Sequence, residues 1–323
     1  MRDPEGRGRA GARLSWATAH RASASGILLT GVLLGACGGA ARSSLQPSAG
    51  PLASPVASVP ATFATATASP AAPSPTGASA PKRQESIAIG GDERVVDLYL
   101  PDIASGASAP LLVLLHANGE SPFVMEGESR IGELAARERI IVALPPARDH
   151  RWVVMVSPGD PITQSADADY VAGLIERLVH DLPVDGRRVF VAGFSMGAVL
   201  TERMACQHAD VVAAVALNAG APWSDECSPS RPVPILVMHG TADSTFRIAL
   251  AGEVVTRWRE LDGCNGAPAT SQLSDVATSE LNEGCAGGTA VQLVRYAGSG
   301  HRWLANPDAT DVLWSFFSEV APR

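Results

Sequence analysis

Clusters of basic residues are absent from this sequence, and their absence limits the partners to expect. The 323 residues include 25 Lys and Arg against 33 Asp and Glu, which gives a formal net charge of −8 at pH 7. No stripe of Lys and Arg is present that would follow a phosphate backbone. We therefore do not expect nucleic acid as a partner.

Aromatic residues are also scarce, at 5% of the chain, whereas 46% of the residues are hydrophobic. The core must then be built mainly from Val, Leu, Ile and Ala. Such residues suit a parallel sheet, because its strands are buried on both faces. No internal repeat is visible, and the length is sufficient for one well-buried α/β domain.

The N-terminus has no apolar run long enough to cross a bilayer as a helix. Five arginines precede a short apolar stretch at 26–36, a pattern typical of an export signal. The stretch ends in Leu-Gly-Ala-Cys37, which resembles a bacterial lipobox, where the cysteine is lipidated and the chain is cut just before it. Residues 1–37 are thus predicted to be a lipoprotein-type signal segment with Cys37 as the lipidation site. Plain secretion is the alternative.

Residues 38–84 consist mainly of Ala, Ser, Pro, Thr and Gly and carry almost no charge. Such a composition cannot bury enough apolar surface to fold, so we predict a disordered linker. The pattern changes after it, and we predict that residues 85–323 form a single catalytic domain.

Short β-branched runs alternate with amphipathic segments of helix length in this domain. The runs are largely continuous and apolar, as buried parallel strands are. The pattern predicts an α/β fold with a mostly parallel central sheet flanked by helices. The predicted strands lie at 94–100, 111–115, 140–144, 188–192, 213–217, 234–238 and 291–296, and the predicted helices at 131–139, 169–180, 196–207, 247–261 and 308–319.

A Gly-Phe-Ser-Met-Gly motif at 193–197 directly follows one predicted strand and opens a predicted helix. This order defines a nucleophile elbow, where the residues beside the serine must be small because the turn is sharp and strained. The helix N-terminus also directs free N–H groups at developing negative charge. Ser195 is the predicted nucleophile, and the N–H of Met196 is the first predicted oxyanion donor. A serine-containing loop without catalysis is the alternative.

A serine hydroxyl needs a base to remove its proton and a carboxylate to orient that base. With a nucleophile elbow the chain order is Ser, then Asp or Glu, then His. Asp243 directly follows a strong buried strand and His301 follows the last strand, so we predict them as the acid and the base. His239 is interpreted as structural, and His150 as a solvated surface residue with substrate contact as the alternative. Other aspartates that lie between the serine and His301 are Asp210, Asp225, Asp262 and Asp275.

The second oxyanion donor is expected in the His-Ala-Asn-Gly loop at 116–119, which follows a predicted strand. We favour the backbone N–H of Asn118, with Ala117 as the alternative donor. The alternative is that this loop is only a polar turn at the end of a buried strand, without a catalytic role.

Four cysteines follow the linker, and an even set in an exported chain indicates two disulfides. Buried free thiols are the alternative. Sequence alone allows three connectivities. None of the four has the C-x-x-C spacing of common zinc sites, so we expect no metal. The four residues are Cys206, Cys227, Cys264 and Cys285.

Several separate blocks carry a family resemblance. They are Asp-Leu-Pro-Val-Asp at 181–185, Val-Ala-Ala-Val-Ala-Leu-Asn-Ala-Gly at 212–220, Arg-Pro-Val-Pro-Ile-Leu-Val-Met-His-Gly-Thr-Ala-Asp at 231–243, Gly-His-Arg-Trp at 300–303 and the closing helix at 308–317. Over roughly 88–320 the chain resembles the secreted polyhydroxybutyrate-depolymerase-like and feruloyl-esterase-like family of α/β-hydrolases. It departs from the family at Ala117, where glycine is usual, and after the serine, where Asn-Gly-Gly is usual.

The resemblance implies an α/β-hydrolase fold and hydrolysis of carboxylic esters without a metal or organic cofactor. It also favours the pairs Cys206–Cys227 and Cys264–Cys285. Each pair would close a loop of about twenty residues and contribute roughly 3 kcal/mol to stability.

Together these features predict an exported serine esterase that acts through a Ser-His-Asp triad and an acyl-enzyme. Its expected substrates are hydroxyalkanoate oligomers, feruloyl esters or acetyl esters, as small molecules or oligomers. We expect a monomer that is held at the cell surface or in the periplasm by a lipid anchor, or is otherwise secreted. The alternatives are a serine peptidase of the same fold and a non-catalytic surface lipoprotein that binds ligands.

Overall fold

The structure is a computed structural model that describes residues 77–320 apart from 155–165 and 224–226. The predicted signal segment, Cys37 and most of the predicted linker lie outside the described residues. Within the described ranges, no helix combines the length and the hydrophobicity that a membrane crossing needs.

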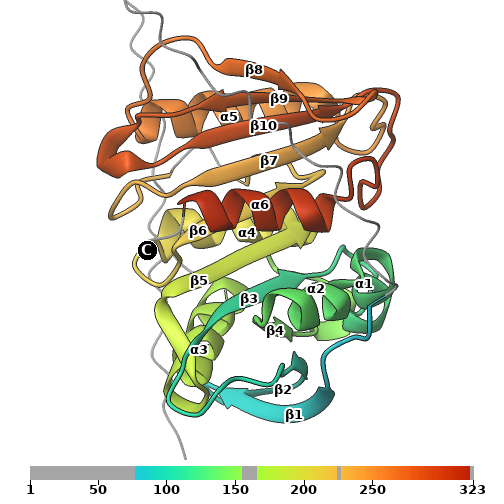
Figure 1. The fold of residues 1–323 in the computed structure, drawn as a ribbon, viewed down its shortest axis with the longest axis vertical. Helices are drawn as coiled ribbons and strands as arrows, with labels where there is room; N and C mark the ends of the chain where they lie inside the picture. Colours follow the sequence, from blue (N-terminus) through green and yellow to red (C-terminus); the bar gives the residue numbers. More distant parts are fainter. Residues whose placement is uncertain (1–76, 155–165, 224–226, 321–323) are drawn as a thin grey trace, which may run out of the picture. The chain divides into compact units, whose positions relative to one another are not determined.

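The described chain forms one ten-stranded sheet with the order β1-β2-β4-β3-β5-β6-β7-β10-β9-β8 (Figure 1). The six strands from β4 to β10 in this order pair in parallel, and the two strands at each edge pair antiparallel. The predicted, mostly parallel central sheet is confirmed. The strands are β1 Lys82–Ile89, β2 Asp92–Tyr99, β3 Ala109–Leu115, β4 Ile141–Leu144, β5 Val184–Phe194, β6 Ala214–Asn218, β7 Ile235–Gly240, β8 Ala269–Gln272, β9 Ala277–Asn282 and β10 Val291–Tyr296.

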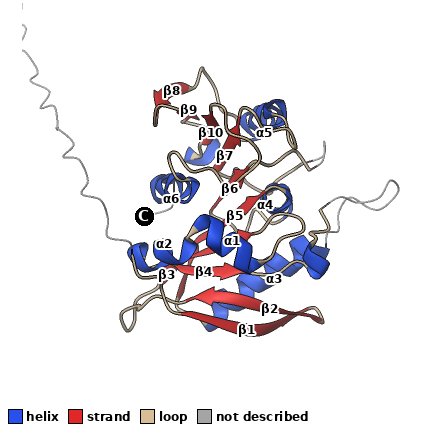
Figure 2. Cartoon of the chain, turned by 90° about the vertical axis from the view of Figure 1, so that its right-hand side faces the viewer, coloured by secondary structure: helices blue, strands red, loops and turns tan. Residues whose placement is uncertain are grey.

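Different helices cover the two faces of the sheet (Figure 2). Side chains of α3, α4 and α5 belong to one core cluster, and side chains of α1, α2 and α6 belong to the other. The helices are α1 Pro122–Ser129, α2 Ile131–Glu138, α3 Ala166–Asp181, α4 Met196–Gln207, α5 Ile248–Leu261 and α6 Ala309–Val320, with short 3₁₀ turns η1 Arg148–His150 and η2 Ala286–Gly288.

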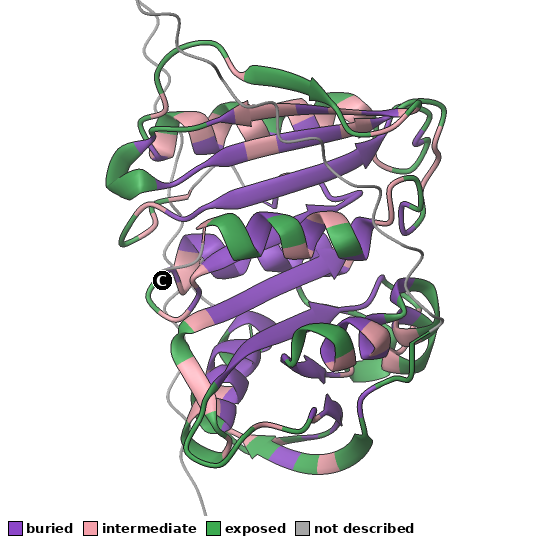
Figure 3. Ribbon diagram, in the orientation of Figure 1, coloured by how far each residue is buried: buried purple, intermediate pink, exposed green. Residues whose placement is uncertain are grey.

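The strand β3 shows why the central strands are continuous apolar runs. Leu111 and Val113 join the core under α3, α4 and α5, whereas Leu112 and Leu114 join the opposite core. Successive side chains of a strand point to opposite faces. Because both faces are covered by helices, every residue of β3 is buried, and the centre of the sheet is buried throughout (Figure 3).

The edges of the sheet differ most from the sequence prediction. β1 begins at Lys82, before residue 85, and Ala80 is already buried, with its N–H donating to the carbonyl of Gly132. At the other edge, β8 was not predicted because its Ala-Thr-Ser-Gln sequence is exposed at every position. A strand without a buried face carries no hydrophobic signal.

The parallel pairing sets where the functional segments meet. β5, β6, β7 and β10 run in the same direction, so their carboxyl ends lie at one edge of the sheet. In open α/β sheets ligands bind at this edge. Ser195 follows β5, Asp243 follows β7, and His301 follows β10.

Candidate active site

Ser195 occupies the sharp turn between β5 and α4. Its backbone has φ 54° and ψ −118°, an unfavourable conformation for a residue with a side chain. A β-carbon on Gly193 would overlap the backbone of Gly197, so only glycine fits there. The N–H of Ser195 donates to the carbonyl of Asn218 on β6, at 3.0 Å. The strained turn is therefore held by the sheet beside it, as a nucleophile elbow requires.

The structure brings the three predicted catalytic side chains together. The Nε2 atom of His301 lies 2.8 Å from the Oγ of Ser195, and its Nδ1 lies 2.7 Å from the Oδ2 of Asp243. With a neutral ring, Nδ1–H donates to the carboxylate and the serine hydroxyl donates to Nε2. This is the arrangement in which the imidazole can accept the serine proton.

The carboxylate of Asp243 is fixed by its own turn. Its Oδ1 accepts the N–H groups of Thr245, at 2.8 Å, and Phe246, at 2.9 Å. The side chain is fully buried, while that of His301 is 19% exposed. The remaining oxygen, Oδ2, is thereby aimed at the histidine.

The other aspartates considered from sequence lie elsewhere. Asp262 accepts the N–H of Val233, and Asp275 accepts the side-chain amide of Asn306. Asp210 is exposed in the turn that follows α4, and Asp225 lies outside the described residues. Within the described part of the chain, Asp243 is the aspartate bonded to His301.

The loops that carry Asp243 and His301 are bonded to each other. The N–H of Ala242 donates to the carbonyl of Ser299, and the N–H of Gly298 donates to the hydroxyl of Thr241, both at 2.9 Å. The side-chain amide of Asn218 also donates to the carbonyl of Arg302, at 3.0 Å. His301 thus sits in a loop fastened on both sides.

The predicted oxyanion loop is braced against the segment that follows β4. The N–H of Gly119 donates to the carbonyl of His150, and the indole N–H of Trp152 donates to the carbonyl of His116. The ring of His116 accepts the N–H of Ala147 through Nε2 and donates from Nδ1 to the carbonyl of Ala117. Burial lowers the pKa of His116, in agreement with this neutral form.

The two predicted oxyanion donors stand in different surroundings. Met196 is the first residue of α4, at the helix N-terminus. Asn118 is exposed in the loop, whereas the N–H of Ala117, the alternative donor, points to the carboxylate of Glu120 at 3.2 Å. Because the N–H of Ala117 already donates to the carboxylate of Glu120, Asn118 is favoured as the second oxyanion donor.

Sequence reasoning missed three neighbours of His301. The ring of Phe194 lies 5.1 Å from the imidazole, centre to centre, and the ring of Phe246 lies 5.7 Å away, edge to face. Glu120 is half-buried, which raises its pKa, while the charge of His301 acts in the opposite direction. Phe194 directly precedes Ser195 and Phe246 lies three residues after Asp243, so their closeness to these residues along the chain was the available signal.

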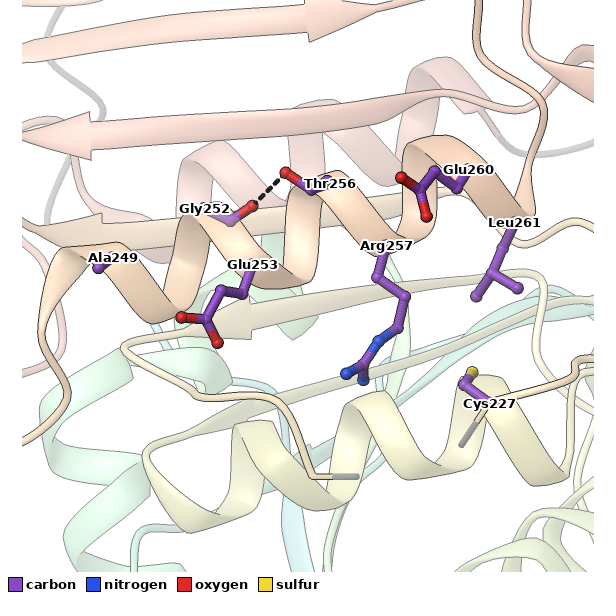
Figure 4. Close-up of a pocket in the computed structure, with 8 residues that line it drawn as sticks. All are labelled: Cys227, Ala249, Gly252, Glu253, Thr256, Arg257, Glu260 and Leu261. Carbon is purple, nitrogen blue, oxygen red and sulfur yellow. Dashed lines mark hydrogen bonds between the residues drawn. The ribbon is translucent and has the colours of Figure 1, made fainter. Parts of the chain in front are cut away.

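A cavity of about 790 Å³ lies along α5, outside this constellation (Figure 4). Glu253 and Arg257 extend from the same side of the helix there, and no triad residue lines the cavity. Within the described ranges there is also no group of three or more His, Cys, Asp or Glu residues able to hold a metal ion.

The structure pairs Cys206 with Cys227 and Cys264 with Cys285, the pairing that the family resemblance implies. The first disulfide joins α4 to the segment after β6, where the indole N–H of Trp223 donates to the sulfur of Cys206. The second joins the end of α5 to the turn before β10.

A family model described as esterase PHB depolymerase matches residues 95–254. Over these residues the chain is similar to this family. The matched segment contains Ser195 and Asp243, whereas His301 lies beyond its end.

Relatives of known description are esterases of several kinds. Feruloyl esterase B of Piromyces equi is 28% identical over 228 residues, covering 64% of this chain and 42% of the relative. Feruloyl esterase D of Neurospora crassa is 27% identical, covering 71% of this chain and 83% of the relative. Poly(3-hydroxyalkanoate) depolymerase C of Paucimonas lemoignei is 23% identical, covering 62% of this chain and 56% of the relative. The chain spans less than half the length of feruloyl esterase B and one third of the bifunctional acetylxylan esterase/xylanase XynS20E of Neocallimastix patriciarum.

Solved structures establish the fold. An acetyl xylan esterase from Aspergillus awamori superposes with a TM-score of 0.60 at 17% identity, covering 74% of this chain and 99% of that structure. A thermostable esterase superposes with a TM-score of 0.54 at 16% identity, covering 74% of this chain and 62% of that structure. The predicted α/β-hydrolase fold is confirmed.

Proposed function

We propose that this protein is an exported serine esterase that hydrolyses carboxylic esters through an acyl-enzyme. One observation carries the proposal: the unbroken line of hydrogen bonds from the Ser195 hydroxyl through His301 to Asp243. The match to an esterase family model supports the same chemistry.

The first half-reaction forms the acyl-enzyme. His301 takes the proton of Ser195 at Nε2 as the serine oxygen attacks the ester carbonyl. The amides of Met196 and Asn118 hold the oxyanion, and Asp243 stabilises the charged imidazole. His301 then gives the proton to the leaving alcohol.

The second half-reaction releases the acid. Water enters in place of the alcohol, and His301 removes a proton from it as the water oxygen attacks the acyl carbonyl. The tetrahedral intermediate is held by the same amides, and its collapse returns the proton to Ser195. No group beyond the described side chains and water is needed to balance the reaction.

The substrates are taken from the classes that the relatives' names state: feruloyl, acetylxylan and poly(3-hydroxyalkanoate) esters. A panel of hydroxybutyrate oligomers, feruloyl esters and acetyl esters, compared by kcat/KM, identifies the acyl preference.

Export and anchoring belong to the same proposal. Two disulfides suit an oxidising compartment. Lipidation of Cys37 would then hold the enzyme at a membrane, with the linker as a tether. A Cys37→Ala variant is expected to leave the membrane fraction, and unchanged retention would argue for another anchor.

The decisive test uses a p-nitrophenyl acetate assay together with a fluorophosphonate probe. Wild-type protein is expected to hydrolyse the ester and take up the probe, and Ser195→Ala is expected to do neither. Probe labelling that persists in Ser195→Ala would place the nucleophile elsewhere. Faster cleavage of an amide than of the matching ester would indicate a peptidase instead.

A further inference from the structure

His239 is a second histidine in contact with the carboxylate of Asp243. It lies at the end of β7, four residues before the aspartate, and its side chain is fully buried. Its Nε2 lies 2.6 Å from the carbonyl oxygen of Phe246 and 3.4 Å from the Oδ2 of Asp243. That carboxylate oxygen is the one bonded to His301.

The contacts define the tautomer of His239. A carbonyl oxygen and a carboxylate oxygen only accept hydrogen bonds, so the Nε2 atom between them carries a hydrogen. The Nδ1 atom is buried and has no hydrogen-bond partner among the described residues, which suits a lone pair rather than a second N–H. Burial lowers the pKa of His239, and the positive charges of His301 and Arg295 act in the same direction against the raising effect of Asp243. The ring is thus neutral, and its one N–H donates to the carbonyl of Phe246 and lies close to the Oδ2 of Asp243.

The shared N–H completes the surroundings of the carboxylate. The Oδ1 atom of Asp243 accepts two backbone N–H groups, and its Oδ2 faces two imidazole N–H groups. The same His239 N–H holds the carbonyl of Phe246, whose ring lies edge to face against His301. His239 therefore contacts both ends of the turn from Asp243 to Phe246.

We infer that His239 is a positioning residue for the triad: its Nε2–H fixes the Oδ2 of Asp243 and the Phe246 carbonyl, so that the ionised carboxylate stays aimed at His301. The inference rests on the proposed function, because it assigns a role within the same triad. A donor to a carboxylate stabilises its ionised form. Without this donor, Asp243 holds the proton of His301 more strongly.

A histidine that only fills space in the core would give a different result on substitution. Methionine at position 239 keeps much of the volume without the N–H. Glutamine places an amide N–H close to the position of Nε2, whereas asparagine places its amide near Nδ1, away from Asp243. Glutamine is therefore expected to preserve the contact, and methionine and asparagine to lose it.

The kinetic test compares His239→Met, His239→Asn and His239→Gln with wild type. We expect Met and Asn to lower kcat by about tenfold to a hundredfold with KM nearly unchanged, in keeping with the loss of one polar contact to a charged group. The acid limb of the pH profile of kcat/KM is expected to move to higher pH. Glutamine should restore both. His180→Met, on the exposed surface of α3, is the control and should behave as wild type.

The NMR resonance of the Nδ1–H proton of His301 separates this inference from the proposed function, because it needs no turnover. We expect this resonance to move in His239→Asn and to return to its wild-type position in His239→Gln. An unchanged resonance in folded His239→Asn, or equal effects of Asn and Gln, would overturn the inference. A shifted resonance in a protein that lacks Ser195-dependent hydrolysis would overturn the proposed function alone. If methionine prevents folding, the Asn and Gln pair still decides.

Discussion

The backbone of Ser299 passes so close to Gly240 that a β-carbon on the glycine would overlap the serine carbonyl. Gly240 ends β7, just before the loop of the acid, and Ser299 lies two residues before His301. The close approach allows the N–H of Ala242 to bond to Ser299. The glycine therefore sets the distance between the loops that carry Asp243 and His301.

Replacing this glycine is expected to separate His301 from Asp243. In Gly240→Ala the loop of His301 must move, because the atom that it meets belongs to the backbone. A displacement of about 1 Å at a reacting group can reduce turnover by about a hundredfold. We expect that loss in p-nitrophenyl acetate hydrolysis, together with a loss of about 1–3 kcal/mol in the free energy of unfolding.

Gly252, inside α5, provides the matched control, because a β-carbon there would meet nothing within 4 Å. In Gly252→Ala the activity should be unchanged and the free energy of unfolding should rise by about 0.5–1 kcal/mol, as alanine favours a helix more than glycine does. Full activity in Gly240→Ala would show that the two loops adjust independently.

The central fold was predictable because its signal lies in the residues themselves. A strand buried on both faces is an apolar run, and Val189 to Ala192 before the motif is one. The edge strand β8 has polar, exposed residues, and its pairing with β9 depends on neighbours that no local pattern contains. The same limit explains why β1 begins at Lys82 inside the predicted linker.

The candidate site was likewise predictable in part from the sequence. Ser195, Asp243 and His301 each follow a buried strand, so strand order alone indicated that they would meet. His239 was interpreted as structural, because the sequence does not show that the turn after β7 folds Asp243 back against it. The electrostatic effect of His301 on Glu120 depends on a loop conformation, which the sequence does not show either.

The identity of the acid can be tested by substitution. Asp243→Asn keeps the shape of the side chain, but the amide can donate to Nδ1 and favour the wrong tautomer of His301. By analogy with other triads, kcat should fall about 10⁴-fold with a small change in KM. Asp275→Asn, which alters one of the other aspartates considered, should remain active. A loss below about tenfold in Asp243→Asn would point to another carboxylate.

The disulfide between Cys264 and Cys285 should contribute stability without contributing to the site. Its residues are separated by 21 positions along the chain. The double variant Cys264→Ala/Cys285→Ala should lose about 3 kcal/mol in the free energy of unfolding by the loop-entropy estimate. Urea unfolding with and without dithiothreitol measures this loss, since reductant should affect wild type more than the variant. Esterase activity in the absence of urea should be retained, and its disappearance would indicate that this bridge supports the triad.

Asp262 gives a prediction about pH and stability. The residue is fully buried, its Oδ1 accepts the N–H of Val233, and burial raises its pKa from 3.8 to about 6. The folded protein therefore binds this proton more tightly than the unfolded chain does. The stability that this bound proton contributes is fully present below about pH 4 and is lost as the pH rises through about 6.

Asp262→Asn removes this dependence, since the amide is neutral at every pH and its oxygen can still accept from Val233. Relative to wild type, the variant should gain up to about 3 kcal/mol in the free energy of unfolding at pH 7.5 and much less at pH 4.5. Urea unfolding at the two pH values measures the difference, with the exposed Asp210→Asn as the control. An equal effect of Asp262→Asn at both pH values would mean that the carboxyl ionises normally in the folded protein. Polar contacts in the folded protein would then compensate for the hydration that the carboxylate of Asp262 loses on burial.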